Sequence, residues 1–114
     1  MKKAEKRLEA YRSGIETLNE VLPEAITQYN QFTGECFEEG EVAKATKHLM
    51  ALSISMKDGD QESITYHMDQ CVELGCSDKE IYETMLVSAA YGGGSAMSQG
   101  VTKGLEILKE LRQR

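Results

Sequence analysis

The residues best suited to chemistry lie on one predicted helix in the second half of the chain. At about 100° per residue, a carboxylate, a hydroxyl, an imidazole and a thiol fall on one arc of this helix. They are Asp60, Ser63, His67 and Cys71. An apolar face of Ile64, Met68 and Val72 runs beside them. The reactive groups therefore lie at the edge of a buried stripe, where the His67 imidazole could exchange a proton near neutral pH if a partner orients it.

The same residues also have purely structural interpretations. Asp60 could serve only as the N-cap of the helix, Ser63 could fill its first turn, and Cys71 could pack as a small apolar residue. His48, the only other histidine, lies on a predicted apolar helix and needs a hydrogen-bonding partner if it is buried. Spacing alone leaves both interpretations open.

A metal site is the less favoured use of these histidines. His48 and His67 could bind a metal together with Asp60 and Glu62, but the chain lacks the histidine pair four residues apart that is typical of metallohydrolase helices. The glycine run 92–94 follows no strand and is followed by no P-loop lysine, so it does not indicate a phosphate site. We therefore expect neither a metal nor another cofactor.

The cysteines indicate a reducing compartment. Cys36, Cys71 and Cys76 are odd in number, and their spacing fits neither a disulfide framework nor a zinc knuckle. Cys71 and Cys76 are not a C-x-x-C motif and could meet only if the end of the helix bends favourably. We expect a cytoplasmic protein.

Apolar periodicity predicts an all-α fold of about six helices in one domain, residues 1–114. The predicted helices cover residues 4–22, 25–32, 41–57, 60–74 and 77–91, with a loop at 33–40. A sixth helix follows the glycine run 92–94 and carries Met97 to Leu111. Each of the first and last helices carries one apolar stripe, whereas the third is apolar on several sides because Met50 and Ile54 lie off its main stripe. Such a helix is expected to be central.

Three local signals define helix ends. Asp60 is placed to cap the fourth helix, and Gly75 stands where a left-handed residue would end it. Ser77 and Glu80 have the spacing of a capping box that opens the fifth helix.

The charge distribution argues against a nucleic acid partner. The net charge is -6, and the segment between the two basic ends, residues 13–102, holds four basic and fifteen acidic side chains. Such a surface repels a phosphate backbone, so we expect no nucleic acid partner. The chain also lacks a long apolar run and an apolar segment after its charged start, so we expect neither a membrane span nor a secretory signal.

The order of several motifs resembles the carboxymuconolactone decarboxylase family, which includes the alkyl hydroperoxidase D proteins. The resemblance covers about residues 37–108 and depends on the segments TKHLMALS (46–53), ITYH (64–67), GCSDKEI (75–81) and AYGG (90–93). It implies an all-helical domain of the alkyl hydroperoxidase D type that binds a small-molecule substrate. It also implies a homo-oligomer, either a trimer or a hexamer, with a site at or near a subunit interface.

The peroxidase branch of that family uses a C-x-x-C pair, a histidine and a glutamate. Here His67 matches the histidine, but Asp60 and Ser63 replace the two cysteines and His48 replaces the glutamate. Because a serine forms neither a disulfide nor a sulfenate, the resemblance does not support a dithiol peroxidase.

The decarboxylase branch, a lyase acting on a small carboxylated lactone, lacks the C-x-x-C pair and keeps the histidine. Our leading hypothesis makes His67 a general acid or base, oriented by Asp60 or His48, with Ser63 bonding the substrate. Lys47 and Lys57 are the nearest cations in the sequence.

Two alternatives stay open. One is a thiol redox protein that uses Cys71 beside His67, with Cys76 as the resolving thiol, which a lowered pKa of Cys71 would favour. The other is a non-catalytic paralogue that binds a ligand or acts as a scaffold.

Overall fold

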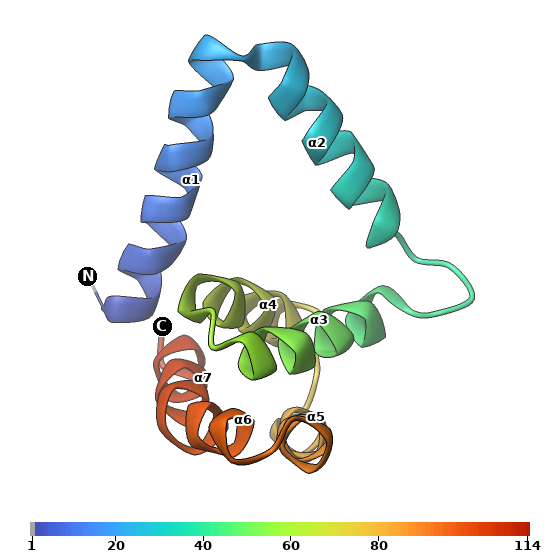
Figure 1. Ribbon diagram of the computed structural model, residues 1–114, viewed down its shortest axis with the longest axis vertical. Coiled ribbons are helices and arrows are strands. Elements are labelled where there is room, and N and C mark those ends of the chain that lie inside the picture. The colour runs from blue at the N-terminus through green and yellow to red at the C-terminus, as the bar shows by residue number, and fades with distance from the viewer. Residues whose placement is uncertain (1) are drawn as a thin grey trace.

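The computed structural model describes residues 2–114 as a chain of helices (Figure 1). They are α1 (Lys3–Val21), α2 (Pro23–Cys36), α3 (Lys44–Asp58), α4 (Gln61–Glu73), α5 (Asp78–Gly92), α6 (Gly94–Gln99), the π-helical turn η1 (Gly100–Gly104) and α7 (Leu105–Arg112). The last three segments follow one another without a break, so residues 2–114 form six helical rods and contain no strand. The predicted all-α fold with about six helices is confirmed.

Two predicted boundaries were wrong. Helix α2 continues to Cys36, through residues that we expected to form a loop, and α3 begins at Lys44 rather than at residue 41. Gly34 does not stop α2, because a glycine can adopt helical torsions at a cost of only about 1 kcal/mol. The Thr33 hydroxyl is satisfied within the helix, where it donates to the Tyr29 carbonyl at 3.1 Å.

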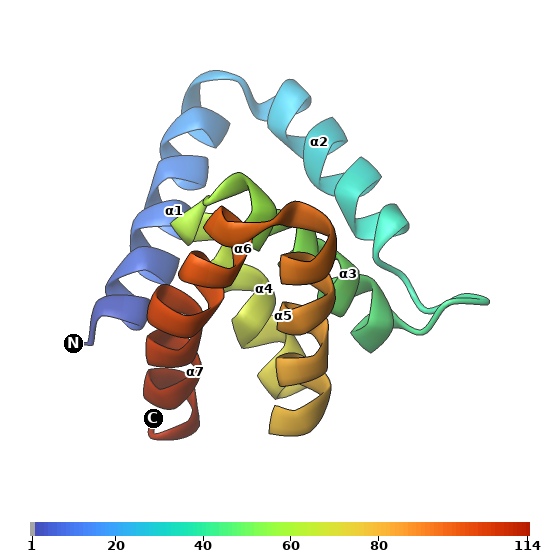
Figure 2. The same cartoon turned by 60° about the horizontal axis from the view of Figure 1, so that its bottom comes forward.

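The core lies between α3, α4, α5 and the last rod (Figure 2). Its largest fully buried apolar side chains are Leu52, Met56, Ile64, Met68, Ile81 and Ile107. Helix α1 joins this core at its first turn, where Ala4 is buried and its amide donates to the Glu110 carboxylate at 2.8 Å.

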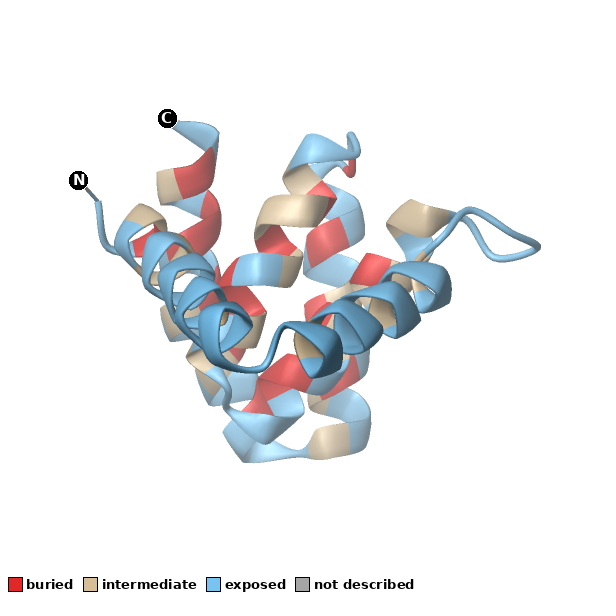
Figure 3. Ribbon diagram, turned by 90° about the horizontal axis from the view of Figure 1, so that it is seen from above, coloured by how far each residue is buried: buried red, intermediate tan, exposed pale blue. Residues whose placement is uncertain are grey.

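Helices α1 and α2 form a hairpin that projects from the core and diverges from α3 (Figure 1). Helix α2 buries no residue, and Figure 3 shows the hairpin almost entirely exposed. The apolar stripe predicted for α1 is buried only at its start, since Tyr11, Leu18 and Leu22 are about half exposed. The reason is that α2 packs chiefly against α1, so no further element within residues 2–114 covers this stripe.

The expectation that α3 would be apolar and covered on several sides is also only half correct. Its main stripe is buried at Leu52 and Met56, but Met50 and Ile54 remain 55% and 62% exposed. Helices α4, α5 and α6 pack on α3, but within residues 2–114 they leave the side with Met50 and Ile54 uncovered.

The end of α4 explains the spacing of two cysteines. Gly75 has a φ of 85°, its amide donates to the Val72 carbonyl at 3.1 Å, and the Cys76 amide donates to the Cys71 carbonyl at 2.9 Å. This pair of bonds is a Schellman motif, in which the residues at the positions of Cys71 and Cys76 make an apolar contact. The predicted left-handed glycine is confirmed.

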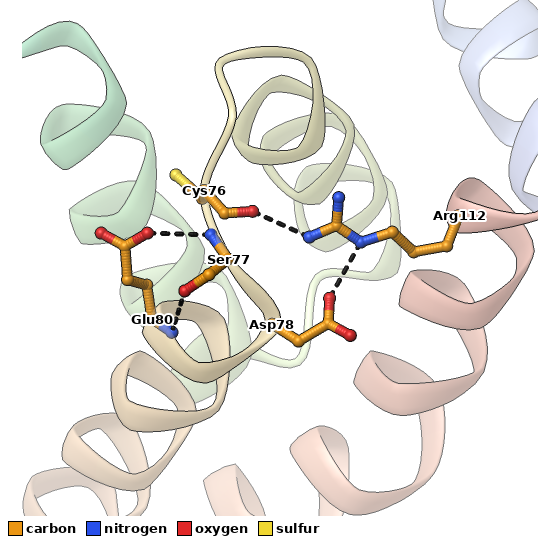
Figure 4. Close-up of polar contacts among 5 residues, drawn as sticks. All are labelled: Cys76, Ser77, Asp78, Glu80 and Arg112. Carbon is orange, nitrogen blue, oxygen red and sulfur yellow. Dashed lines mark hydrogen bonds and ion pairs between the residues drawn. The ribbon is translucent and has the colours of Figure 1, made fainter.

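The start of α5 is held by a capping box and by hydrogen bonds from Arg112 of α7 (Figure 4). The Glu80 amide donates to the Ser77 hydroxyl at 3.1 Å and the Ser77 amide donates to the Glu80 carboxylate at 2.8 Å, so the predicted capping box is confirmed. Arg112 donates to the Asp78 carboxylate and to the Cys76 carbonyl, each at 2.8 Å. These contacts fix the α4–α5 turn against α7.

None of the helices in residues 2–114 combines the length and the apolar character needed to cross a bilayer.

Candidate functional site

A cavity of about 430 Å³ lies between the α1–α2 hairpin and the helices α3 and α4. Its walls carry four aromatic rings, those of Tyr11, Tyr29, Phe37 and Tyr66. Both histidines of the chain line the same cavity. The hairpin that leaves the core thus encloses a space lined by aromatic side chains and imidazoles.

The structure brings His48 and His67 together. His48 lies one turn into α3 and is 2% exposed, whereas His67 lies in the middle of α4 and is partly exposed. Because α3 packs on α4, the two rings meet with 3.0 Å between their Nδ1 atoms. A hydrogen bond between these nitrogens requires one Nδ1–H to donate and the other Nδ1 to accept. His48 thus has the partner that a buried imidazole needs.

Aromatic rings surround this pair. Phe37, the C-cap residue of α2, stacks on both imidazoles with centroid distances of 4.5 Å to His48 and 5.4 Å to His67. Tyr66 meets both rings edge-on, at 6.2 Å from His48 and 5.0 Å from His67. These contacts hold the rings in place and exclude water from their faces.

The surroundings keep both histidines neutral at pH 7. Burial, and to a smaller extent the neighbouring His48, lower the pKa of His67 to about 4, and the Asp60 carboxylate opposes this shift. Burial also lowers the pKa of His48, and the Lys44 ammonium adds to this effect. A neutral imidazole has one N–H and one free lone pair, so each ring can both donate and accept.

Asp60 and Ser63 form a helix cap rather than a direct part of the histidine pair. Asp60 accepts from the Ser63 amide at 3.3 Å and from the Ser63 hydroxyl at 2.8 Å. These bonds lower the pKa of the Asp60 carboxyl. Within residues 2–114 no hydrogen bond joins Asp60 to either imidazole, so the observed orienting partner of His67 is His48. Ser63 nevertheless lines the cavity.

The cation in the cavity wall is Lys44. It is partly buried, it lines the cavity, and it precedes His48 by one turn of α3. The two lysines nearest in sequence lie elsewhere, because Lys47 donates to the Glu38 carbonyl at 2.7 Å and the Lys57 chain lies against Gly92. The carboxylates of Glu62 and Glu38 also line the cavity, but both residues are exposed.

The cysteines lie outside this cavity. Cys71 and Cys76 are buried in the core, and burial raises the pKa of Cys71 to about 12. Burial also raises the pKa of Cys76. A thiol is reactive as its thiolate, so this environment opposes nucleophilic chemistry at Cys71. The lowered pKa that would have favoured the thiol hypothesis is not found.

Sequence reasoning missed several wall residues. Lys44 had a usable signal, since its spacing of four residues from His48 puts both on one face of a helix. Tyr66 is adjacent to His67 in sequence. Phe37 had no such signal, because it lies in a segment that we expected to be a loop and reaches the histidines only through the path of α2.

Among residues 2–114, no group of three or more His, Cys, Asp or Glu side chains is arranged to hold a metal ion. Besides the exposed carboxylates and the Ser63 hydroxyl, the cavity offers two neutral imidazoles, one ammonium group and aromatic walls. These groups suit proton transfer on a small molecule with a flat framework and an anionic group.

These observations define a class of protein, an all-helical domain with a histidine pair between its third and fourth helices. Residues 23–102 match the carboxymuconolactone decarboxylase family, and the chain belongs to this family. No curated protein is a significant match to the chain.

Solved structures share this fold over nearly their whole length. A carboxymuconolactone decarboxylase family protein from Legionella pneumophila, in its apo form, has a TM-score of 0.91 at 21% identity, with 96% of each chain covered. A family member from Thermotoga maritima, for which a role in the antioxidative response has been suggested, has a TM-score of 0.83 at 28% identity, covering 95% of this chain and 91% of that one. A second structure from Thermotoga maritima gives 0.86 at 27% identity, covering 95% and 94%.

Proposed function

We propose that the protein is a lyase of the decarboxylase type that acts on a small carboxylated substrate through acid–base chemistry at His67. The observation that carries this proposal is the 3.0 Å contact between two neutral imidazoles in the wall of a cavity. Acid–base chemistry needs a group that can give and take a proton, and an oriented neutral imidazole has one N–H that can donate and one lone pair that can accept.

Each wall of the cavity has a place in this reaction. Lys44 binds the substrate carboxylate or a second anionic group, and the aromatic rings pack on its framework. When a carboxylate leaves as carbon dioxide, its bonding electron pair stays on the substrate and is protonated at carbon by His67. The reaction consumes one proton and needs no oxidant, no thiol and no metal.

Turnover of a panel of small carboxylated lactones tests this function. We expect His67→Ala to lower kcat by about 100-fold or more, the usual contribution of a general acid or base. Lys44→Met should raise KM by about tenfold, the lower end of what a charged hydrogen bond contributes. The matched control is Lys109→Met, which removes an exposed lysine of α7 outside the cavity wall.

The outcome separates this proposal from the alternatives. Turnover that survives His67→Ala unchanged would exclude His67 as the acid or base. A panel that gives neither turnover nor thermal stabilisation would favour the non-catalytic paralogue.

We also propose that the chain assembles with copies of itself into a trimer or a hexamer. Large apolar side chains stand exposed on the hairpin, on α3 and on α5, among them Phe32 at 68%, Ile54 at 62% and Val87 at 65%. Monomeric proteins rarely expose extended apolar patches, whereas stable oligomers bury them between subunits. A second copy fits because the exposed stripes of α1 and α2 have helical spacing but no covering helix in their own chain.

The molar mass in solution tests assembly. We expect light scattering to give three or six times 12.7 kDa. Phe32→Glu should weaken the assembly, whereas Gln31→Glu adds the same charge at the neighbouring exposed position of α2 and should not. A monomeric mass for the unaltered chain would contradict the proposal.

A further inference from the structure

The two imidazoles face each other through chemically identical atoms, which constrains their protons. With 3.0 Å between the Nδ1 atoms, two N–H groups would repel each other, and two bare nitrogens would leave the buried contact unbonded. One proton must therefore lie between the rings. If His48 carries it, neutral His67 accepts at Nδ1 and must carry its own proton at Nε2.

The outward atoms of the pair then have opposite roles. In that state the Nε2 of His48 is a free lone pair and the Nε2 of His67 is an N–H donor. Within residues 2–114 no hydrogen bond occupies either Nε2, and both residues line the cavity. The cavity therefore presents one base and one acid that are joined through the bridge.

We propose that His48 and His67 act as one proton relay, in which a proton that leaves Nε2 of one ring is replaced through the Nδ1–Nδ1 bridge by a proton that enters at Nε2 of the other. The inference rests on the proposed function and deepens it, because it makes His48 a partner in proton transfer rather than a residue that only orients His67.

The protons balance at each step. The Nε2–H bond of His67 breaks as the substrate carbon gains the proton, and the bridging proton moves from Nδ1 of His48 to Nδ1 of His67. His48 gains a proton at Nε2 from water, and the hydroxide that remains adds to the released carbon dioxide to give bicarbonate. Both rings are neutral before and after, with their tautomers exchanged. Proton exchange of the two Nε2 atoms with water restores the starting tautomers before the next turnover.

The relay answers a difficulty of the single-histidine mechanism. A neutral imidazole that donates its only proton becomes an anion, which burial strongly disfavours. A concerted transfer across the bridge avoids this anion. The stacked Phe37 ring and the edge-on Tyr66 ring contact both imidazoles and keep them at the Nδ1–Nδ1 distance of 3.0 Å.

Nuclear magnetic resonance of the free protein tests the relay without a substrate. The chain has only two histidines, so a long-range proton–nitrogen spectrum of metal-free, nitrogen-15-labelled protein shows four ring nitrogens. At pH 7 we expect one shared proton on the Nδ1 atoms, with both rings exchanging between their two neutral tautomers. Acidification should protonate the pair in two coupled steps below pH 6.5, because the charge on the first ring opposes protonation of the second.

Three results would overturn the relay. They are two rings fixed as Nε2–H tautomers with bare Nδ1 atoms, two independent titrations near the ordinary histidine pKa, and a shift of both Nδ1 signals on adding one equivalent of zinc, which would indicate a two-histidine metal site.

A second variant separates this inference from the proposed function. His48→Gln keeps a side-chain amide that can donate to Nδ1 of His67 but cannot pass a proton on. With any lactone turned over by the unaltered protein, we expect His48→Gln to lower kcat at least tenfold and to leave KM within twofold. Loss of turnover in His67→Ala with unchanged kcat in His48→Gln would refute the relay and leave the proposed function standing. A spectrum that shows the shared proton, together with no turnover on the panel, would support the proton bridge and refute the proposed lyase function.

Discussion

Acidification should destabilise the fold through the buried histidine pair. The pKa of His67 falls from 6.5 to about 4 on folding, so between these values the unfolded chain binds a proton that the folded chain does not. The contribution of His67 to stability is therefore complete above pH 6.5 and is lost as the pH falls towards 4. His48, whose pKa is lowered by burial and by Lys44, changes stability in the same direction.

The magnitude follows from the size of the shift. A pKa moved from 6.5 to about 4 corresponds to about 3 kcal/mol. His67 is only partly buried, so solvent screens part of this energy and we expect about 2 kcal/mol from it between pH 7.5 and 4.5. The lowered pKa of Asp60 adds little in this window, because its contribution is lost only as the pH falls below 3.8.

Urea unfolding followed by circular dichroism, at one fixed protein concentration and at several pH values from 7.5 to 4.5, measures this loss. The control is the double variant His48→Gln with His67→Gln, which keeps every carboxylate and removes both imidazoles. We expect the free energy of unfolding to decline clearly less in the variant. Equal declines in the two proteins would refute the view that folding keeps the rings neutral.

Three further predictions concern the helix ends and the thiols. Ser77→Ala, which removes half of the capping box with Glu80, should lower the free energy of unfolding by about 1 kcal/mol in urea titrations, and an unchanged value would show that the box contributes nothing. Gly75→Ala should cost about 1 to 2 kcal/mol in the same assay, because φ at this position is 85°, and a neutral effect would contradict the left-handed conformation. One equivalent of hydroperoxide should leave Cys71 and Cys76 reduced in the folded protein and oxidise them only in urea, as peptide masses would show; a rapid Cys71–Cys76 disulfide in the folded state would revive the thiol mechanism.

Local signals were the part of the fold that sequence could predict. Asp60, Gly75 and the Ser77–Glu80 box each act within four residues of their own position, so the helix ends that they form can be predicted from the sequence. The same is true of apolar periodicity, which located the helices.

Tertiary packing was the part that sequence could not predict. A stripe such as that of α1 shows that a helix has an apolar face, but not whether its own chain covers it, and Leu18 and Leu22 remain exposed. For the candidate site too, sequence indicated some of the residues but not how they come together. His48 and His67 stood out as the only histidines, yet their meeting depends on how α3 packs on α4, and Phe37 reaches them only through the path of α2.

The exposed hairpin and the histidine pair are physically linked through Phe37. This residue ends α2, and its ring covers both imidazoles, so its position depends on a helix that buries no residue and packs chiefly on α1. Movement of α2 would uncover the rings, admit water and raise the pKa of His67 back towards 6.5, because burial is the largest cause of its depression. In the proposed assembly, contacts of a second copy with the apolar side of α2 would hold Phe37 in place. Assembly and a neutral histidine pair should therefore depend on each other, even if no residue of the second copy enters the cavity.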